Sequence, residues 1–385
     1  MKVMIACGGT GGHLIPGLAV AETLLLRGHP VRLLVSEKAI DQTVLTGFRS
    51  SLESSRLSVR GISAVGCGTS RQLITFCGRL MRATKDSYEE CGEFEPDAVL
   101  GMGGFISAPV ILAARWRRIP AVIHESNAIP GRANRWTGKL ANHVAVGWAD
   151  CARYFGRTPV TVTGTPLRSA LCRGKVTDAH ERLGLERGRL TVAVMGGSQG
   201  AHAINEVVTA TLTRLKDWFR HRALGVQFVH LTGAQDEEVV RAAYEADGLK
   251  ANVMGFCNEM ELVYSVADVV VARAGAATLT EIAAFGLPAV LVPYPHAANN
   301  HQLCNALAFE RAGAARIVEQ GDATDRASFC ERMAEALTTL LGDDVARARM
   351  SATAKSLAIP DAAERIAAIL ERYERGHIPN GVNQC

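Results

Sequence analysis

Two glycine-rich loops carry the clearest chemical signal in this 385-residue sequence, because each follows an apolar run and precedes a helical pattern. The first covers residues 8–13 (Gly-Gly-Thr-Gly-Gly-His) and the second covers residues 196–200 (Gly-Gly-Ser-Gln-Gly). Glycine lets backbone N–H groups approach an anion closely, and the first turn of a helix adds partial positive charge. Such loops are typical of phosphate binding. A tight strand-to-helix turn without a ligand is the alternative for either loop alone.

Neither loop has the spacing of a dinucleotide or P-loop motif. The G-x-G-x-x-G fingerprint would need glycine at position 14, where the chain has Leu14, and Ser198 breaks it in the second loop. A dehydrogenase is therefore disfavoured, and the lack of Gly-Lys-Ser/Thr after either loop argues against a P-loop. Because both loops follow strands, we expect them to line one cleft between two domains.

A third segment, residues 273–281, follows another apolar run and opens a further helical pattern. Amides at the helix start could bind phosphate, and the carboxylate of Glu281 could accept hydrogen bonds from ribose hydroxyls. This pairing suits a nucleoside diphosphate, although Glu281 could instead only stabilise the helix. The chain has no Asp-x-Asp pair. We therefore expect amides and helix dipoles to stabilise a leaving diphosphate, with no metal and no cofactor.

Short apolar runs, glycine-rich turns and helical patterns alternate along the chain and must position these loops. Such alternation predicts parallel sheets covered on both faces. We expect strands at residues 2–6, 31–35, 98–102, 121–124, 144–146, 160–162, 190–195, 226–231, 269–271 and 289–292. We expect helices at residues 14–27, 201–215, 278–285, 300–312, 325–341 and 361–375.

The strand, glycine loop and helix that open the chain occur again after Leu190. This repetition predicts an α/β fold of two Rossmann-like domains that face each other across a cleft. We place the N-terminal domain at residues 1–164 and the C-terminal domain at residues 165–357. A C-terminal helix at residues 358–376 is expected to join the N-terminal domain.

Composition and charge exclude several classes of protein. Apolar residues make up 48% of the chain and charged residues 21%, which excludes a disordered chain or a small disulfide scaffold. The net charge of +4 is too small to argue for nucleic acid. The ten cysteines form no C-x-x-C pair, so we expect reduced and mostly buried thiols. The apolar runs are too short or too interrupted for a signal peptide or a transmembrane segment.

Taken together, these segments resemble the peptidoglycan N-acetylglucosaminyltransferases of the MurG type, a family with the GT-B glycosyltransferase fold. The resemblance covers nearly the whole chain, and its motifs are specific only in combination. They are residues 8–13 with Pro16, 101–105, 124–127, 196–201, 273–281, and 292–296 leading to 300–302.

The resemblance implies inverting transfer of GlcNAc from UDP-GlcNAc to the C4 hydroxyl of undecaprenyl-diphospho-MurNAc-peptide (lipid I). The product would be lipid II, the precursor of peptidoglycan. The expected location is the cytoplasmic face of the cell membrane, as a peripheral protein, with no nucleic acid as a partner.

The resemblance also implies which residues bind the substrates. In the N-terminal domain these are Thr10, Gly11 and Gly12 for the diphosphate side and Asn127 for the sugar. For the donor they are Arg168, Ser198, Cys257 (through its backbone, toward uracil), Ala276, Ala277, Thr278, Leu279, Thr280, Glu281 and Gln302. Two positions depart from the family pattern, since Ser126 replaces a glutamine and Thr165 replaces an asparagine. Both departures concern local packing more than chemistry.

Inversion by single displacement needs a general base for the acceptor hydroxyl. His13 follows the first glycine loop, and histidine has a suitable intrinsic basicity. It could equally contact phosphate or cap the helix. Glu125, at the end of a strand on the same sheet edge, is the rival base, and it could instead orient another group.

A lipid acceptor requires contact with a membrane. Leu73, Phe76 and Leu80 fall on one face of a helical pattern, Arg82 falls on the other, and Trp116 lies among arginines. Apolar side chains beside basic ones are typical of proteins that bind an anionic membrane surface. The alternative is an amphipathic helix that faces the core.

Two other functions compete with this one. A different GT-B protein, such as a lipid glycosyltransferase or a sugar-nucleotide epimerase, is disfavoured by His13 and by the segment around Gln302. A catalytically silent subunit that binds a nucleotide sugar is disfavoured by the two candidate bases.

Overall fold

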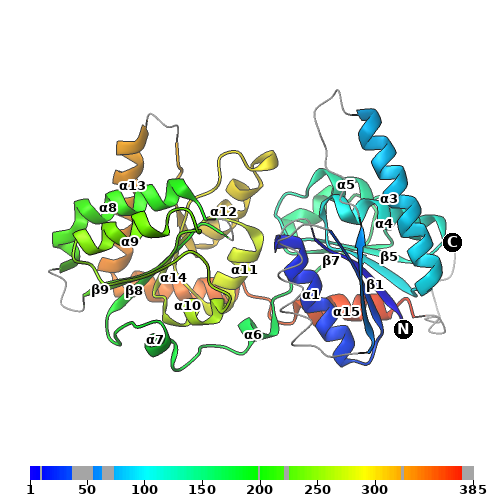
Figure 1. Cartoon of the computed structure of the whole chain (residues 1–385), viewed down its shortest axis with the longest axis horizontal. Coiled ribbons are helices and arrows are strands. Elements are labelled where there is room, and N and C mark those ends of the chain that lie inside the picture. Colours follow the sequence, from blue (N-terminus) through cyan, green and yellow to red (C-terminus); the bar gives the residue numbers. More distant parts are fainter. Residues whose placement is uncertain are drawn as a thin grey trace. The chain divides into compact units, whose positions relative to one another are not determined.

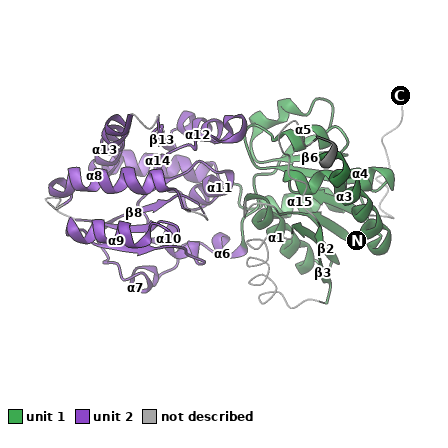
Figure 2. Cartoon of the chain, turned by 45° about the horizontal axis from the view of Figure 1, so that its top comes forward, with its two compact units in different colours: residues 1–168, 359–385 green, residues 169–358 purple. Residues whose placement is uncertain are grey.

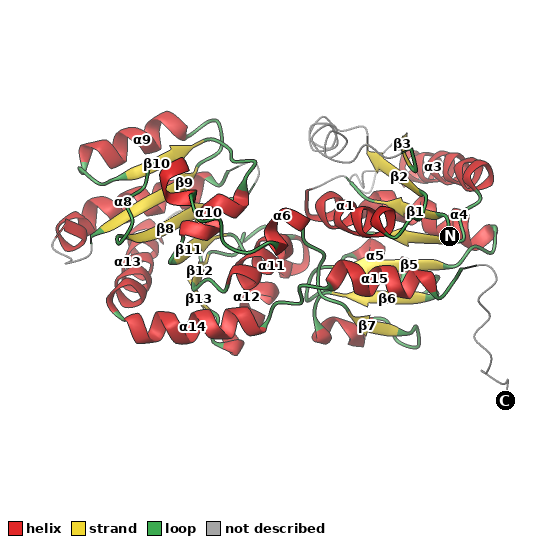
Figure 3. Cartoon of the chain, turned by 90° about the horizontal axis from the view of Figure 1, so that it is seen from below, coloured by secondary structure: helices red, strands yellow, loops and turns green. Residues whose placement is uncertain are grey.

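The apolar runs form two parallel sheets in the computed structural model, which describes residues 1–8, 11–36, 55–62, 73–197, 200–220, 225–321 and 325–374. Figure 1 shows the elements in chain order, and Figure 2 colours the two compact units. Unit 1 comprises Met1–Arg168 and Ile359–Cys385, and unit 2 comprises Ser169–Ala358. Each unit holds one of the sheets, with helices on both of its faces (Figure 3).

Unit 1 is built on a seven-stranded sheet in the order β3-β2-β1-β4-β5-β6-β7. Every pairing in it is parallel. Its elements are β1 (Val3–Ala6), α1 (Gly11–Leu26), β2 (Val31–Ser36), β3 (Leu57–Ile62), α3 (Leu73–Phe94), β4 (Ala98–Gly101), α4 (Gly104–Trp116), β5 (Ala121–Glu125), α5 (Arg132–Thr137), β6 (His143–Val146), the 3₁₀ helix η2 (Ala149–Tyr154), β7 (Val160–Val162) and α15 (Ala362–Glu371).

Alternate residues of the strands in unit 1 face two different apolar layers. Val3 and Ile5 of β1 belong to the layer with α1 and α15, whereas Met4 and Ala6 belong to the layer with α3 and α4. All four side chains are fully buried. Strands buried on both faces explain why the central strands are continuous apolar runs.

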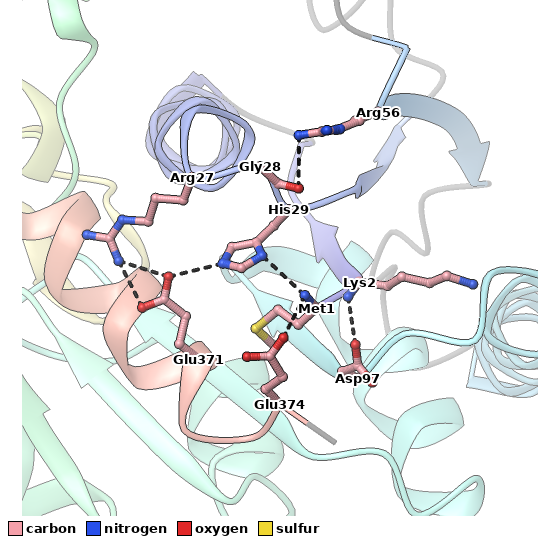
Figure 4. A network of polar contacts seen from close by, with 9 residues as sticks. All are labelled: Met1, Lys2, Arg27, Gly28, His29, Arg56, Asp97, Glu371 and Glu374. Atoms are coloured by element: carbon pink, nitrogen blue, oxygen red, sulfur yellow. Dashed lines mark hydrogen bonds and ion pairs between the residues drawn. The ribbon is translucent and has the colours of Figure 1, made fainter. Parts of the chain in front are cut away.

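Helix α15 packs into the core of unit 1, although it lies at the other end of the sequence. Ile366 and Leu370 are fully buried in the layer that contains α1. Figure 4 shows the polar contacts at its end, where Arg27 Nη1 donates to both carboxylate oxygens of Glu371 at 3.0 and 2.9 Å. The amino group of Met1 lies 3.0 Å from Glu374 Oε1 in the same network.

Unit 2 is built on a six-stranded parallel sheet in the order β10-β9-β8-β11-β12-β13. Its elements are α6 (Ser169–Cys172), α7 (Ala179–Arg182), β8 (Leu190–Met195), α8 (His202–Arg220), β9 (Val226–Leu231), α9 (Glu237–Ala246), β10 (Ala251–Met254), α10 (Met260–Val266), β11 (Val269–Ala272), α11 (Ala276–Phe285), β12 (Ala289–Leu291), the 3₁₀ helix η3 (Ala298–Asn300), α12 (His301–Ala312), β13 (Ala315–Ile317), α13 (Arg326–Gly342) and α14 (Asp344–Ser356).

The strand order of unit 2, like the first six strands of unit 1, is the Rossmann order with a switch point beside the first strand. In unit 1 the switch lies between β1 and β4, and in unit 2 it lies between β8 and β11. Ligands of such sheets bind beyond the carboxyl ends of the strands at the switch point. Both glycine-rich loops start there.

The side chains expected to face a membrane have different environments. Phe76 and Leu80 are half-buried and pack against the core layer of α3 and α4, which is what the alternative of a core-facing helix predicts. Trp116 is 63% exposed and Arg82 is also exposed. The side chain of Leu73 lies outside the described residues.

Candidate active site

His13 lies in the first turn of α1, against the turn that follows β4. A Cβ atom placed on Gly103 would lie 3.1 Å from Nε2 and Cδ2 of the His13 imidazole, and also 3.1 Å from Asn134 Nδ2. Gly103 also has a φ of 102°, which L side chains rarely adopt. Glycine is thus required at 103 both for backbone conformation and for space. The bare backbone allows the imidazole to sit beside the ends of β1, β4 and β5.

Glu125, the last residue of β5, is 3% exposed, and its carboxylate organises the loop that follows. Oε1 accepts hydrogen bonds from the backbone N–H and the Nδ2 of Asn127, at 2.9 and 3.0 Å. Oε2 accepts from the Gly131 N–H at 3.0 Å and from Asn134 Nδ2 at 2.9 Å. A carboxylate that accepts four such bonds holds the loop after β5 in place, because each bond ties another donor of that segment to it.

His124, next to Glu125, is also part of the framework of unit 1. It is fully buried, and its Nε2 donates to the Gly164 carbonyl at 2.9 Å. Burial holds the pKa of His124 below its usual value, so the ring is neutral. Ser126 Oγ lies 3.4 Å from His124 Nδ1, and Thr165 is buried near Gly147. The two departures from the family pattern therefore lie within packed structure.

In unit 2, the start of α11 presents backbone amides at the carboxyl end of β11. Gly275 is the N-cap residue and has no side chain that could accept from the first N–H groups. Glu281 lies two turns further and is 9% exposed. Its Oε2 accepts a 2.6 Å hydrogen bond from the hydroxyl of Tyr264. A helix start without a side-chain cap and a hydrogen-bonded carboxylate thus occur on one helix, α11.

Arg273 connects three segments at the same edge of the sheet. Its Nη1 donates to the carbonyls of Val292 and Pro293 at 3.1 and 3.2 Å, and its Nη2 donates to Gln320 Oε1 at 2.9 Å. Burial lowers the pKa of this guanidinium to about 10. The positive charge remains at neutral pH and fixes the segment that leads to Gln302.

The segment before α12 has a strained backbone. Asn299 and Asn300 have φ angles of 54° and 53°, in the left-handed region that non-glycine residues rarely adopt. Gln302 follows in the first turn of α12, and its Oε1 accepts from the Tyr294 N–H at 2.9 Å. Strain of this kind is concentrated at functional sites, where the surrounding structure maintains it.

A buried polar network lies beside Gly200, the last residue of the second glycine-rich loop, and no sequence pattern indicated it. A Cβ on Gly200 would lie 2.2 Å from the Thr232 carbonyl, so the loop and the end of β9 are in close contact. Asn205 Nδ2 donates to that carbonyl at 2.9 Å and to Asp236 Oδ2 at 2.7 Å. The Oδ1 of Asn205 lies 3.0 Å from His230 Nε2. These contacts define the position of the loop.

The remaining candidate residues are placed as follows. Gly11 and Gly12 open α1, and Cys257 follows β10 and is partly exposed. Arg168 ends the first segment of unit 1, and its Nε is buried without a hydrogen-bond partner among the described residues. Thr10 and Ser198 lie outside the described residues.

Two features are absent from the described ranges. No group of three or more His, Cys, Asp and Glu side chains could hold a metal ion there. None of the helices described there is long and apolar enough to span a bilayer.

Comparison with known proteins agrees with this architecture. Residues 3–146 match the glycosyltransferase family 28 N-terminal domain, and residues 191–366 match the glycosyltransferase family 28 C-terminal domain. A crystal structure of MurG from Acinetobacter baumannii superposes with a TM-score of 0.73 at 28% identity, over 96% of this chain and 99% of that one. UDP-GlcNAc 2-epimerase from Neisseria meningitidis, bound to UDP-GlcNAc, has a TM-score of 0.68 at 14% identity and covers 97% and 100%, a similarity of fold alone. The prediction of two Rossmann-like domains is confirmed.

Two curated relatives are similar along nearly their whole length. Both are named UDP-N-acetylglucosamine--N-acetylmuramyl-(pentapeptide) pyrophosphoryl-undecaprenol N-acetylglucosamine transferase. The protein from Thermodesulfovibrio yellowstonii is 35% identical over 377 residues, which cover 97% of this chain and 99% of the relative. The protein from Syntrophotalea carbinolica is 39% identical over 371 residues, which cover 95% and 97%. The chain therefore belongs to glycosyltransferase family 28 and, within it, to the family of these N-acetylglucosamine transferases.

Proposed function

We propose that this chain transfers GlcNAc from UDP-GlcNAc to the C4 hydroxyl of undecaprenyl-diphospho-MurNAc-peptide, with inversion at the anomeric carbon, to form lipid II for peptidoglycan synthesis. The names and the full-length similarity of the relatives support this reaction. The structural observation that supports it is that in each unit a glycine-containing turn joins a central strand to a helix that carries a polar residue suited to sugar chemistry, His13 on α1 in unit 1 and Glu281 on α11 in unit 2.

Unit 2 binds the donor in this proposal. Amides at the start of α11, from Ala276 to Thr278, accept the diphosphate, and Glu281 accepts hydrogen bonds from the ribose. The backbone at Cys257 meets the uracil ring, and Gln302 contacts the hydroxyls of GlcNAc. Amides that are already fixed at a helix start stabilise the charge that develops on the departing UDP without reorganisation during the reaction.

Unit 1 binds the acceptor and supplies the general base. His13 is the better candidate for the base, because the carboxylate of Glu125 already accepts four hydrogen bonds from its own loop. Glu125 serves instead to orient Asn127, which contacts the sugar. In this mechanism the imidazole removes the proton of the C4 hydroxyl while the oxygen attacks the anomeric carbon and UDP departs.

Unit 1 also meets the membrane in which the acceptor is embedded, at the cytoplasmic face. The exposed indole of Trp116 and the exposed guanidinium of Arg82 support this contact. Arg115 and Arg118, which are close to Trp116 in sequence, line a hollow of about 420 Å³ together with Lys139. Cationic side chains beside an exposed indole favour a surface rich in anionic lipid.

Release of UDP tests the proposed reaction. The chain is incubated with UDP-GlcNAc in detergent, with and without a lipid-linked muramoyl peptide, and UDP is measured over time. We expect release that depends on the acceptor and saturates with it. Release at the same rate without any acceptor contradicts the proposal, because it indicates hydrolysis or another reaction of the donor.

A further inference from the structure

Tyr264 is a fully buried tyrosine whose hydroxyl contacts the carboxylate of Glu281. It lies in α10 and has 0% of its surface exposed. Its hydroxyl donates to Glu281 Oε2 over 2.6 Å, a length typical of a strong bond to a charged acceptor. The two residues are 17 positions apart and belong to different helices, so only the fold brings them together.

The position of Tyr264 is itself fixed by packing. Its ring lies against that of Phe285, one turn beyond Glu281 on α11, with 5.4 Å between the ring centroids. Its hydroxyl is also 3.5 Å from the sulfur of Met195, the last residue of β8. Tyr264 therefore links the helix that carries Glu281 to the strand that leads into the second glycine-rich loop.

A held carboxylate recognises a diol better than a mobile one. A glutamate side chain loses rotamer freedom when it is ordered, and a ligand that must impose the order loses affinity. A carboxylate has about four acceptor positions, and Tyr264 occupies one of those of Glu281. A bond already present in the protein removes this entropic cost from ligand binding.

We propose that Tyr264 is a positioning residue for nucleotide recognition, whose hydroxyl orients the Glu281 carboxylate toward the ribose diol of the bound nucleotide. This inference rests on the proposed binding of UDP by unit 2. A residue with a purely structural role would stabilise the core to the same extent without affecting which hydroxyl groups the site recognises.

The experiment compares UDP with 2′,3′-dideoxy-UDP, which lacks the diol, by isothermal titration calorimetry on the full chain. The variant Tyr264→Phe removes one oxygen and keeps the ring against Phe285. We expect the wild-type chain to prefer UDP. In Tyr264→Phe the affinity for UDP should fall by up to about tenfold, because the ligand must then order the Glu281 side chain on binding. The affinity for dideoxy-UDP should stay within about twofold.

Tyr244→Phe is the matched control, because Tyr244 is another buried tyrosine of unit 2 with a bonded hydroxyl, 3.2 Å from His230 Nδ1. It should leave the ratio of the two affinities unchanged. Glu281→Gln should abolish the preference for UDP, and adding Tyr264→Phe to it should change the ratio no further. If Tyr264→Phe lowers the affinities for both nucleotides equally, or leaves the ratio of the two affinities unchanged, the inference is wrong. The proposed function is not contradicted by that result. A wild-type chain that binds no UDP contradicts the proposed function as well.

Discussion

The side-chain amide of Asn134 donates to the carboxylate of Glu125, with 2.9 Å between Nδ2 and Oε2, and the same nitrogen lies 3.0 Å from the His124 carbonyl. Asn134 is 3% exposed and comes from α5, nine residues after Glu125. The bond closes a loop around a buried anion at the end of β5. Glu125 therefore acts as a structural anchor at the acceptor edge of unit 1.

Glu125→Gln tests this role, because the new amide would place a donor against groups that themselves donate. We expect destabilisation of unit 1 by about 1–3 kcal/mol, the cost of buried polar groups without partners. Thermal unfolding measures it, and UDP affinity should be unchanged. Glu89→Gln, on the exposed face of α3, is the control and should leave Tm unaltered. A large fall in kcat with unchanged Tm would instead favour Glu125 as the base.

His13→Ala tests the general base. We expect kcat to fall by more than about 100-fold, within the range that a positioned base contributes. UDP affinity measured by calorimetry should be kept, because the donor residues belong to unit 2. Turnover close to that of the wild-type chain would contradict the assignment.

Acid should destabilise unit 2 through His230. Burial lowers the pKa of this histidine from 6.5 to about 3, although the Asp236 carboxylate opposes the shift. The unfolded chain therefore binds a proton below pH 6.5 that the folded chain does not, and stability falls as the pH falls. From pH 7 to pH 5 the loss from this group is about 2 kcal/mol.

His230→Gln measures this contribution. The slope of unfolding free energy against pH, from denaturant titrations, should be shallower in the variant than in the wild-type chain. His202 changes stability with pH in the opposite direction. Its hydrogen bond to Asp236 raises its pKa, so the stability that it contributes is lost as the pH rises. An unchanged slope in His230→Gln would show that His230 takes up a proton in the folded chain.

Membrane contact should depend on the exposed residues of unit 1 rather than on the half-buried ones. Arg82→Ala should reduce co-sedimentation with vesicles rich in anionic phospholipid by about fivefold, for roughly 1 kcal/mol per basic residue. Trp116→Ala should also reduce it, because an indole favours the membrane interface. Tm should remain unchanged. Binding that is indifferent to anionic lipid and to salt would contradict the contact.

Phe76→Ala provides the contrast, because Phe76 packs against the core. It should lower Tm by creating a cavity. Vesicle binding by Phe76→Ala should fall only as far as the amount of folded protein falls.

The sequence predicted the central strands well and three edge or near-edge strands not at all. Strands such as β1 and β8 are buried along their whole length, so they are continuous apolar runs. The missed strands are β3, β10 and β13, which are the outermost strands of their sheets and only partly buried. Strands that face solvent need no apolar run, and their residues resemble those of loops.

The positions of the glycine-rich turns after β1 and β8 could be predicted, because a strand, a glycine-rich turn and a helix form a local sequence pattern. The partners of Glu281 and Glu125 could not, since Tyr264 lies in the apolar helix α10 and Asn134 lies in the short polar helix α5. Nothing in their spacing links them to the acids that they hold. Packing and topology alone create these pairs.

The linkage in the product is the most direct test of the central claim. The chain is supplied with UDP-GlcNAc and the lipid-linked muramoyl peptide, and the disaccharide is analysed by NMR and mass spectrometry. The account predicts a β-linked GlcNAc on the C4 oxygen of the muramoyl sugar, with one UDP released for each disaccharide. An α linkage, a different hydroxyl as acceptor, or consumption of UDP-GlcNAc without any disaccharide would contradict it.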